Sequence, residues 1–354
     1  MRWVVSLATV STLCVFSLWG NADVESRVSL LECKMKAAHD DMFYECRGGA
    51  RFASGRPFLN SNGFWAIGDV LYWTSYQGGT EIAYSTETDP SGQVPNRIRS
   101  LNFDWDVGYR LGLGWVTPHD NMELSLLFTR VEPDGDFGMR TQAPNELNGV
   151  ILPGISDFSR ALVDWHLKYS TLDFELSRSY FLSRYFYLRP YFGSRTAWIH
   201  QGAELEFTDP AAQTVLSHLR NDFTGSGLRV GSDSKWFFAR HWNFFMGASA
   251  SALYGKYAVE TGANQTITYG ADIATSVYRM AISAQTQVGL GWETNFSCDS
   301  NQIAINVGYE LNYWWRQNQQ PILESISGSD HVYGARQSKD LGFHGLTVDL
   351  QLAF

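Results

Sequence analysis

Long apolar runs and basic clusters are both scarce in this 354-residue chain. Past the first 22 residues, no stretch approaches the ~18 consecutive apolar residues of a membrane-spanning helix. The chain is acidic, with 27 Lys and Arg, 36 Asp and Glu, and a formal net charge of −9. That balance argues against nucleic acid or anionic lipid as a partner, because both attract basic patches. The chain is therefore predicted to be either secreted and soluble or embedded in a membrane as β-strands.

Motifs for chemistry are also missing. The eight histidines have no metal-ligand spacing and do not cluster with cysteine. The chain has no phosphate-binding loop, no dinucleotide-binding fingerprint and no nucleophile elbow. We therefore predict no catalytic residues, no metal ion and no cofactor.

Cysteine is rare as well. The chain has four cysteines, and three of them, Cys33, Cys46 and Cys298, follow the first apolar run. An odd number in an exported chain predicts one disulfide and one further thiol. We expect either a disulfide between Cys33 and Cys46 or a cross-link through Cys298 to a neighbouring chain.

The N-terminal residues have the parts of a secretory signal peptide. A basic residue precedes an apolar run, and small residues end at Ala22, where we expect cleavage of residues 1–22. In residues 23–46 the apolar positions are spaced four and three apart. This spacing predicts a short amphipathic helix, or a coiled coil that brings chains together as a homo-oligomer. Residues 47–62, with their Gly, Pro and Asn, predict a linker.

From Gly63 onward the apolar residues recur at every second position. Between Leu101 and Val116 every odd position is apolar or aromatic, while most even positions are Asn, Asp, Gly or Arg. Such a long alternation predicts a strand well beyond the usual length in globular sheets, as a membrane barrel requires. At Ser170 and Thr171 the apolar phase slips, which predicts a β-bulge.

The alternation predicts ten strands, at 64–76, 100–117, 122–132, 161–177, 185–203, 222–233, 242–259, 272–292, 301–317 and 339–354. Short gaps alternate with long ones at 77–99, 133–160, 204–221 and 318–338. Outer-membrane barrels have short periplasmic turns and long external loops, and an even strand number places both termini in the periplasm. We predict an all-β fold, a transmembrane antiparallel up-and-down β-barrel over residues 63–354. It has about ten strands, within a range of eight to twelve, and Glu81 to Thr86 would supply an extra hairpin.

The last strand ends in alternating apolar residues and Phe354, which resembles the signal by which the barrel-assembly machinery recognises its clients. Other stretches resemble the Legionella-type major outer membrane protein family of pore-forming proteins, over about Gly63 to Phe354. They are Asp69-Val70-Leu71-Tyr72-Trp73, Trp105-Asp106-Val107-Gly108-Tyr109-Arg110-Leu111-Gly112-Leu113-Gly114, Leu188-Arg189-Pro190-Tyr191-Phe192-Gly193-Ser194-Arg195, and Tyr309-Glu310 with Tyr313-Trp314-Trp315. The resemblance implies a porin-like pore in the outer membrane of a Gram-negative bacterium, without catalytic residues.

Charged residues on the inward phase of the predicted strands are candidates for lining a pore: Asp104, Asp106, Arg110, Arg189, Arg195, Arg279, Glu310 and Arg316. They predict either ion pairs that fill a narrow barrel or an electrostatic constriction that filters solutes. We predict passive diffusion of small hydrophilic solutes or ions, with a weak cation preference set by acidic loops.

The sequence is also compatible with two other functions. One is a non-conducting structural or adhesive barrel whose external loops, such as Val131 to Arg160, do the work. The other is an outer-membrane hydrolase that uses Asp330-His331. The expected partners are outer-membrane lipid, the barrel-assembly machinery, small solutes and a second copy of the chain, and not nucleic acid.

Overall fold

The chain divides into an N-terminal unit, residues 1–51, and a barrel unit, residues 52–354, and each is described by itself. The computed structural model describes residues 31–35, 63–86, 96–117, 122–140, 146–149, 158–183, 185–211, 213–239, 241–264, 273–296, 301–319, 321–325, 332–336 and 338–354. In the N-terminal unit, residues 31–35 are helical. The predicted signal peptide, the linker and the rest of the predicted helix lie outside the described residues. No helix in the described part is long and apolar enough to cross a membrane.

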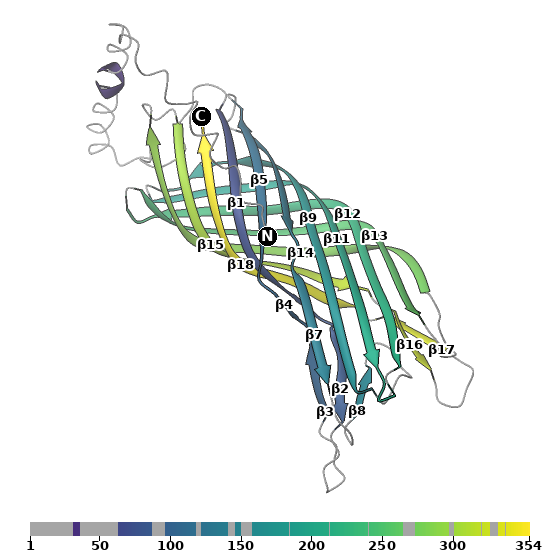
Figure 1. Ribbon diagram of the computed structural model, residues 1–354. Helices are drawn as coiled ribbons and strands as arrows, with labels where there is room; N and C mark the ends of the chain where they lie inside the picture. The colour runs from purple at the N-terminus through teal and green to yellow at the C-terminus, as the bar shows by residue number, and fades with distance from the viewer. Residues whose placement is uncertain are drawn as a thin grey trace, which may run out of the picture. The chain divides into compact units, whose positions relative to one another are not determined.

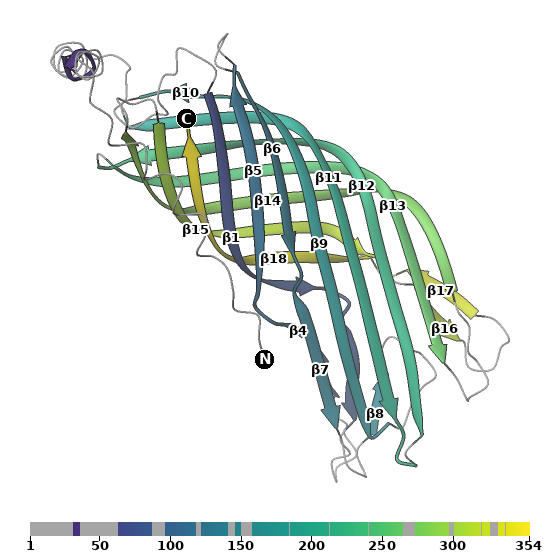
Figure 2. The same cartoon turned by 45° about the horizontal axis from the view of Figure 1, so that its top comes forward.

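Ten antiparallel strands close into a barrel (Figures 1 and 2), which confirms the predicted fold. Strand β1 (Gly63–Gln77) pairs with both β18 (Lys339–Ala353) and β5 (Asp106–Val116), so the first and last strands meet. Around the barrel the neighbours follow chain order, as an up-and-down topology requires. The other strands are β6 (Met122–Val131), β9 (Arg160–Arg178), β11 (Phe186–Thr208), β12 (Thr214–Phe237), β13 (Trp242–Asn264), β14 (Ile273–Phe296) and β15 (Asn301–Asn318).

Short strands extend the barrel at the end opposite the C-terminus (Figure 1). Strand β7 (Asp134–Arg140) follows β6 after Pro133, which cannot donate to the ladder, and pairs with β4 (Asn102–Phe103) and β9. Strands β2 (Glu81–Thr86), β3 (Asn96–Ser100) and β8 (Glu146–Gly149) form a separate sheet, and β16 (Pro321–Ser325) pairs with β17 (Val332–Arg336). The two-residue strand β10 (Tyr180–Phe181) pairs with β11 at the other end. Residues 81–86 therefore form a strand outside the barrel, and the barrel count stays at ten.

The apolar face of the long strands changes sides partway along the barrel. In β9, Trp165 and Tyr169 are buried inside the barrel, whereas Phe174 is exposed on its outer face. The register of β9 with β6 and β11 runs without a shift through Ser170 and Thr171. The predicted bulge is therefore wrong: the strand continues, and its two faces exchange polarity.

The same exchange divides the segment that was predicted as one strand over 100–117. Leu101 and Phe103 are buried inside the barrel, but Val107 and Leu113 are 70% and 65% exposed on its outer face. Asp104 and Trp105 separate β4 from β5 at the change. An apolar outer face suits lipid, and an apolar inner face suits a strand whose outside meets water.

The predicted long loop at 204–221 is wrong for the same reason. Strands β11 and β12 stay paired as far as Thr208 and Thr214, and the Asp209 N–H donates to the Gln213 carbonyl across the turn at 2.9 Å. In this part of β11 the inward residues are apolar, such as Leu205, and the outward ones are polar, such as Glu204. A search for apolar residues on the outer face therefore missed the strand extension.

The last residue adds the final backbone pair to the ladder that closes the barrel, which yields a prediction about assembly. Phe354 exchanges two backbone hydrogen bonds with Phe64, at 2.8 and 2.9 Å. We expect deletion of Phe354 to lower the amount of heat-modifiable protein in the outer membrane, because it removes these bonds and leaves the start of β1 unpaired at the seam of the barrel. Phe354→Ala keeps the backbone bonds and serves as the control for the loss of the ring. Normal outer-membrane levels of the deletion, measured by fractionation, would contradict the prediction.

Candidate functional site: the charged interior of the barrel

Arg110 stands at the centre of the charged interior. Its Nη1 lies 3.0 Å from Asp69 Oδ2 on β1, and its Nη2 lies 2.7 Å from Glu310 Oε1 on β15. Its Nε donates to Thr129 Oγ1 on β6 at 3.1 Å. All four residues are buried. A single guanidinium on β5 thus ties three other strands together through charge-assisted hydrogen bonds.

A second cluster lies on β9, β11 and β12. Arg195 binds the Asp173 carboxylate in a bidentate manner, with Nε and Nη2 at 2.6 and 2.7 Å from its two oxygens. Arg229 Nη1 lies 3.1 Å from Asp173 Oδ2, and Arg229 Nε lies 3.2 Å from Glu175 Oε1. The planar guanidinium explains why Arg rather than Lys occupies these positions, since its fixed fork matches a carboxylate.

Gln285 on β14 joins the two clusters. Its Oε1 accepts hydrogen bonds from Arg195 and Arg229, at 2.9 and 3.0 Å. Its Nε2 donates to Glu310 Oε1 at 2.5 Å. One connected set of side chains, which we call the charged layer, therefore runs from β1 and β5 across to β11 and β12. The charged layer comprises Asp69, Arg110, Asp173, Glu175, Arg195, Arg229, Gln285 and Glu310.

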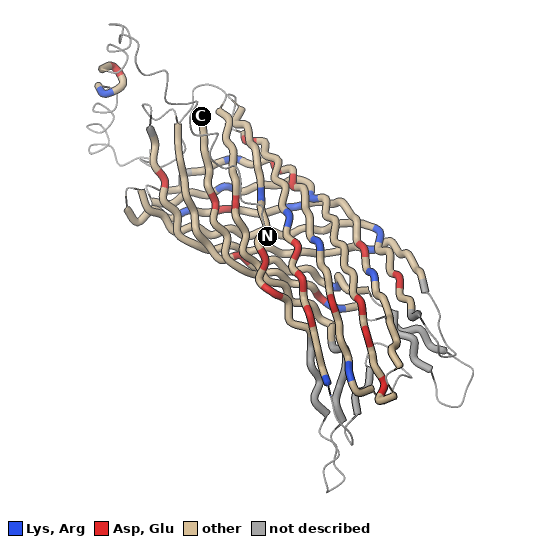
Figure 3. Tube along the Cα trace, viewed as in Figure 1, with Lys and Arg blue, Asp and Glu red and all other residues tan. Residues whose placement is uncertain are grey.

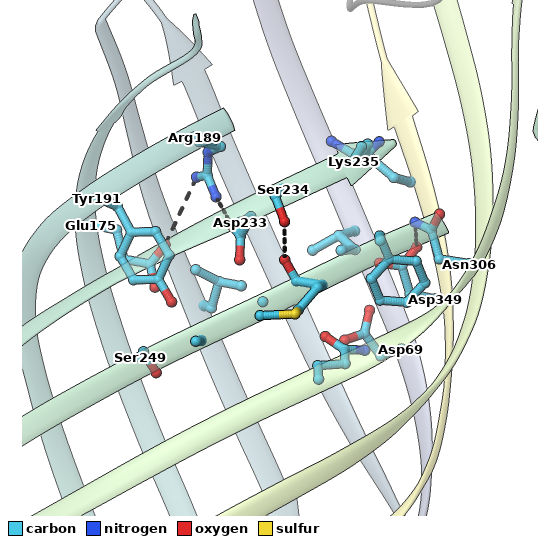
Figure 4. A pocket seen from close by; sticks show the side chains of 18 of the residues that line it. Asp69, Glu175, Arg189, Tyr191, Asp233, Ser234, Lys235, Ser249, Asn306 and Asp349 are labelled. Atoms are coloured by element: carbon cyan, nitrogen blue, oxygen red, sulfur yellow. Dashed lines mark hydrogen bonds and ion pairs between the residues drawn. The ribbon is translucent and has the colours of Figure 1, made fainter. Parts of the chain in front are cut away.

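A cavity of about 190 Å³ lies between the charged layer and the end of the barrel that holds the C-terminus. Figure 4 shows Arg189 beside Glu175 and Asp233, and Asn306 beside Asp349, on its walls. Arg189 Nη1 and Nη2 lie 2.8 and 3.0 Å from Asp233 Oδ2 and Glu123 Oε1. Asn306 Nδ2 donates to Asp349 Oδ1 at 2.6 Å. The cavity is therefore a polar vestibule with charges of both signs.

Aromatic side chains fill the lumen on the other side of the charged layer. The ring centroids of Tyr169 and Phe343 lie 4.6 Å apart, those of Tyr169 and Trp314 6.0 Å, and those of Trp73 and Phe343 6.4 Å. The ring centroids of Phe223 and Trp314 also lie 6.4 Å apart. These five residues, the aromatic layer, come from β1, β9, β12, β15 and β18, and each is at most 2% exposed. The described side chains therefore close the lumen at this level.

Four of the eight predicted pore-lining residues lie in the interior network, namely Arg110, Arg189, Arg195 and Glu310. The other four do not join it. Asp104 is exposed between β4 and β5, and Asp106 accepts a hydrogen bond from the Asp134 backbone. Arg279 is exposed and donates to Gln319, and Arg316 is exposed with a φ of 54°. The alternation breaks at Asp104 and at the left-handed Arg316, so the predicted lumen-facing position of these two is wrong. Asp106 and Arg279 keep the inward phase of β5 and β14 but lie outside the charged layer.

Several interior residues were missed by the sequence analysis. Asp69, Asp173, Glu175 and Arg229 all have the inward phase of their strands, but none was selected as a candidate. The available signal was alternation itself, since each is flanked by outward apolar residues such as Val70 and Leu228. The sequence could not show which of the interior charges pair with one another, because partners such as Arg110 and Glu310 are 200 positions apart.

The predicted cysteine pairing is not settled by the described residues. Cys33 is disulfide-bonded, but Cys46 and Cys298 lie outside the described part. The proposed pairing and the cross-linked homo-oligomer stay predictions. In the described ranges, no three His, Cys, Asp or Glu side chains are grouped as ligands of a metal ion.

Comparison with known proteins gives one family match and several distant structural likenesses. The model of the family described as Legionella pneumophila major outer membrane protein precursor matches residues 60–354. No curated protein matches the chain. The outer membrane protease OmpT from Escherichia coli is similar at 7% identity over 85% of this chain and 99% of that one, with a TM-score of 0.41. The attachment invasion locus protein Ail of Yersinia pestis has 8% identity over 83% and 99%, with a TM-score of 0.24. These TM-scores support no inference about function.

The buried pairs yield a prediction about stability. Arg110→Ala should lower the free energy of unfolding by about 3–5 kcal/mol, because it leaves Asp69 and Glu310 buried without their cation. His166→Ala is the matched control, since His166 pairs with Asp134 at an exposed site, and should cost at most about 1 kcal/mol. Urea unfolding of both variants in lipid vesicles measures the difference. Equal losses in the two variants would argue against a structural role for the charged layer.

Proposed function

Since this chain belongs to the Legionella pneumophila major outer membrane protein family, we propose that it is a porin-like protein with a normally closed lumen. It is a protein of the cell outer membrane. In this proposal small hydrophilic solutes or ions diffuse passively through the barrel when the charged and aromatic layers open. The protein is not an enzyme in this proposal, and its interior residues act by charge and size alone.

The observation that supports a pore is the charged layer itself. Burying ion pairs is usually no better for stability than filling the same volume with apolar side chains. This barrel does use apolar filling farther from the C-terminus, where Trp165, Leu205 and Phe207 are almost fully buried. A barrel that needed only to be filled could have continued that packing. Charges held at mid-barrel fit an electrostatic constriction instead.

The signs of the interior charges support a weak cation preference. Arg110, Arg189, Arg195, Arg229 and Lys235 are the cations of the charged layer and vestibule. The carboxylates are more numerous: Asp69, Glu123, Asp173, Glu175, Asp233, Glu293, Glu310 and Asp349. An excess of fixed negative charge attracts cations into a pore and repels anions.

The second candidate function is a non-conducting structural or adhesive barrel. The aromatic layer favours it, because side chains that are at most 2% exposed leave no water-filled path at their level. A hydrolase is less well supported. Asp330 and His331 lie outside the described residues, and the Asp134–His166 pair, at 2.8 Å, has both side chains more than 60% exposed. An exposed pair of this kind is common on protein surfaces and does not by itself indicate a catalytic site.

Conductance of the refolded protein in planar bilayers separates the two candidates. We expect rare, small channel events for the natural sequence and more frequent or larger ones for Trp314→Ala, which opens the aromatic layer. Trp236→Ala, at a Trp that is 59% exposed on the outer face, should leave conductance unchanged. A silent membrane for both the natural protein and Trp314→Ala, with folding verified by heat-modifiable mobility, would support the non-conducting barrel.

Ion selectivity yields a further prediction. Under a KCl gradient the reversal potential should have the sign of a cation-preferring pore. The preference should weaken as salt rises, since the Debye length is about 10 Å at 0.1 M and shorter above it. Glu310→Gln, which removes one carboxylate from the charged layer, should shift the potential toward anions. An anion-selective potential of the natural protein would show that the interior arginines dominate the filter.

A further inference from the structure

The outer face of the barrel carries a band of basic residues that the proposed pore does not use. Arg130, Lys168, His200, Arg220 and Lys256 occupy outward positions on β6, β9, β11, β12 and β13, which are neighbours in the sheet. We call these five residues the basic band. All five are exposed.

The strand register places the members of the band close to one another on neighbouring strands. Lys168 is the partner of His200, and His200 is the partner of Asp222. Asp222 is in turn the partner of Ala258 on β13. Arg220 precedes Asp222 by two residues on β12, and Lys256 precedes Ala258 by two residues on β13. Arg130 is the partner of Ser170, two residues from Lys168 on β9. Each member therefore lies within two residues, about 7 Å along its strand, of the register line through Lys168 and His200.

The band marks the edge of the apolar outer face. Toward the C-terminal end of the barrel, the outward residues are apolar or aromatic, such as Phe174, Leu228 and Tyr254. Tyr254 and Lys256 are successive outward residues on β13. In a barrel of the outer membrane, this edge is where the acyl chains end and the lipid headgroups begin.

Beyond the band the outward charges become acidic. Asp164, Glu204 and Glu260 are exposed and lie four residues farther along the same strands than Lys168, His200 and Lys256. Four residues correspond to roughly 13 Å along a strand. In Figure 3 most acidic segments of these strands lie nearer the end opposite the C-terminus. The outer face therefore changes from apolar to basic and then to acidic with height.

Two members of the band have no neutralising partner among the described residues. Arg130 pairs with Glu132, while Arg220 and His200 share Asp222, at 2.7 and 3.2 Å. Lys168 and Lys256 form no ion pair with any side chain in the described part of the barrel. Two strands, β11 and β12, separate β9 from β13, so the two lysines are at least ~14 Å apart across the sheet.

We propose that the basic band binds the phosphate groups of lipid headgroups in the leaflet at this end of the barrel, with Lys168 and Lys256 as its main contacts. The height of the band matches the headgroup level, and unpaired lysines attract anionic headgroups. Their separation is too large for one free phosphate ion and suits neighbouring lipid molecules. The net charge of −9 concealed this site, because it averages a local basic band with acidic residues elsewhere. The proposal needs membrane embedding but is independent of conduction.

Lipid retention tests the proposal directly. The refolded full chain would be purified in neutral detergent with bis-phosphorylated lipid A, and the bound lipid counted by native mass spectrometry. We expect Lys168→Gln with Lys256→Gln to lower retention roughly tenfold or more. The pair Lys168→Arg with Lys256→Arg should retain the lipid, and Lys339→Gln, at an exposed lysine on β18 outside the band, should bind as the natural chain does. Heat-modifiable mobility verifies folding of every variant.

Two further arms identify the ligand. Dephosphorylated lipid A should be retained far less than the phosphorylated form, and millimolar inorganic phosphate should not displace the lipid. Equal retention by the Gln pair and the natural chain would overturn the proposal, as would equal retention of the two lipids. Displacement by inorganic phosphate would also overturn it, because the site would then be one for free anions.

Discussion

Each long strand of this barrel must present apolar side chains to lipid over one part of its length and to the protein interior over the rest. Because side chains alternate along a strand, an apolar outer face leaves an inward face that is free to be polar, and the reverse holds beyond the lipid. In β9 this exchange occurs between Tyr169 and Phe174 without any break in register. The polar interior at the level of the lipid and the apolar interior beyond it both follow from this constraint.

The charged layer exists because the strands that face lipid turn polar side chains inward, and because the lumen between them is narrow. Ten strands leave room for side chains and little else, so arginines and carboxylates meet across the lumen and pair. The pairing is not complete: Asp69 Oδ1 and Arg195 Nη1 are buried without a hydrogen-bond partner. Unsatisfied groups of this kind raise the energy of the packed state. The aromatic layer holds such a group as well, because Trp314 Nε1 is buried without a hydrogen-bond partner. Incomplete pairing therefore does not by itself decide which layer rearranges.

The sequence predicted all ten strands because alternation is strong wherever lipid faces the chain. It failed where the apolar residues turn inward, at Leu101 and Phe103, at Ser170, and along 204–221, because apolar was equated with outward. For the interior, phase placed Arg110, Arg189, Arg195 and Glu310 correctly. It could not show which charges meet, since pairing across a barrel depends on closure and register. Gln285 shows the same limit: it is uncharged, and only the register of β14 in the closed barrel brings it between Arg195 and Glu310.

The two layers close the lumen by different physics, and this decides how a pore would behave. Charges of the charged layer can exchange partners or take up water as they move, so opening there retains much of their interaction. Exposing a large aromatic side chain to water forfeits its buried apolar area, at about 3 kcal/mol for each ring. Moving two rings, such as Trp314 and Phe343, would therefore cost about 6 kcal/mol. At that free energy the open state has a population on the order of one in ten thousand. The aromatic layer would therefore set how often the barrel opens, and the charged layer which ions pass when it does.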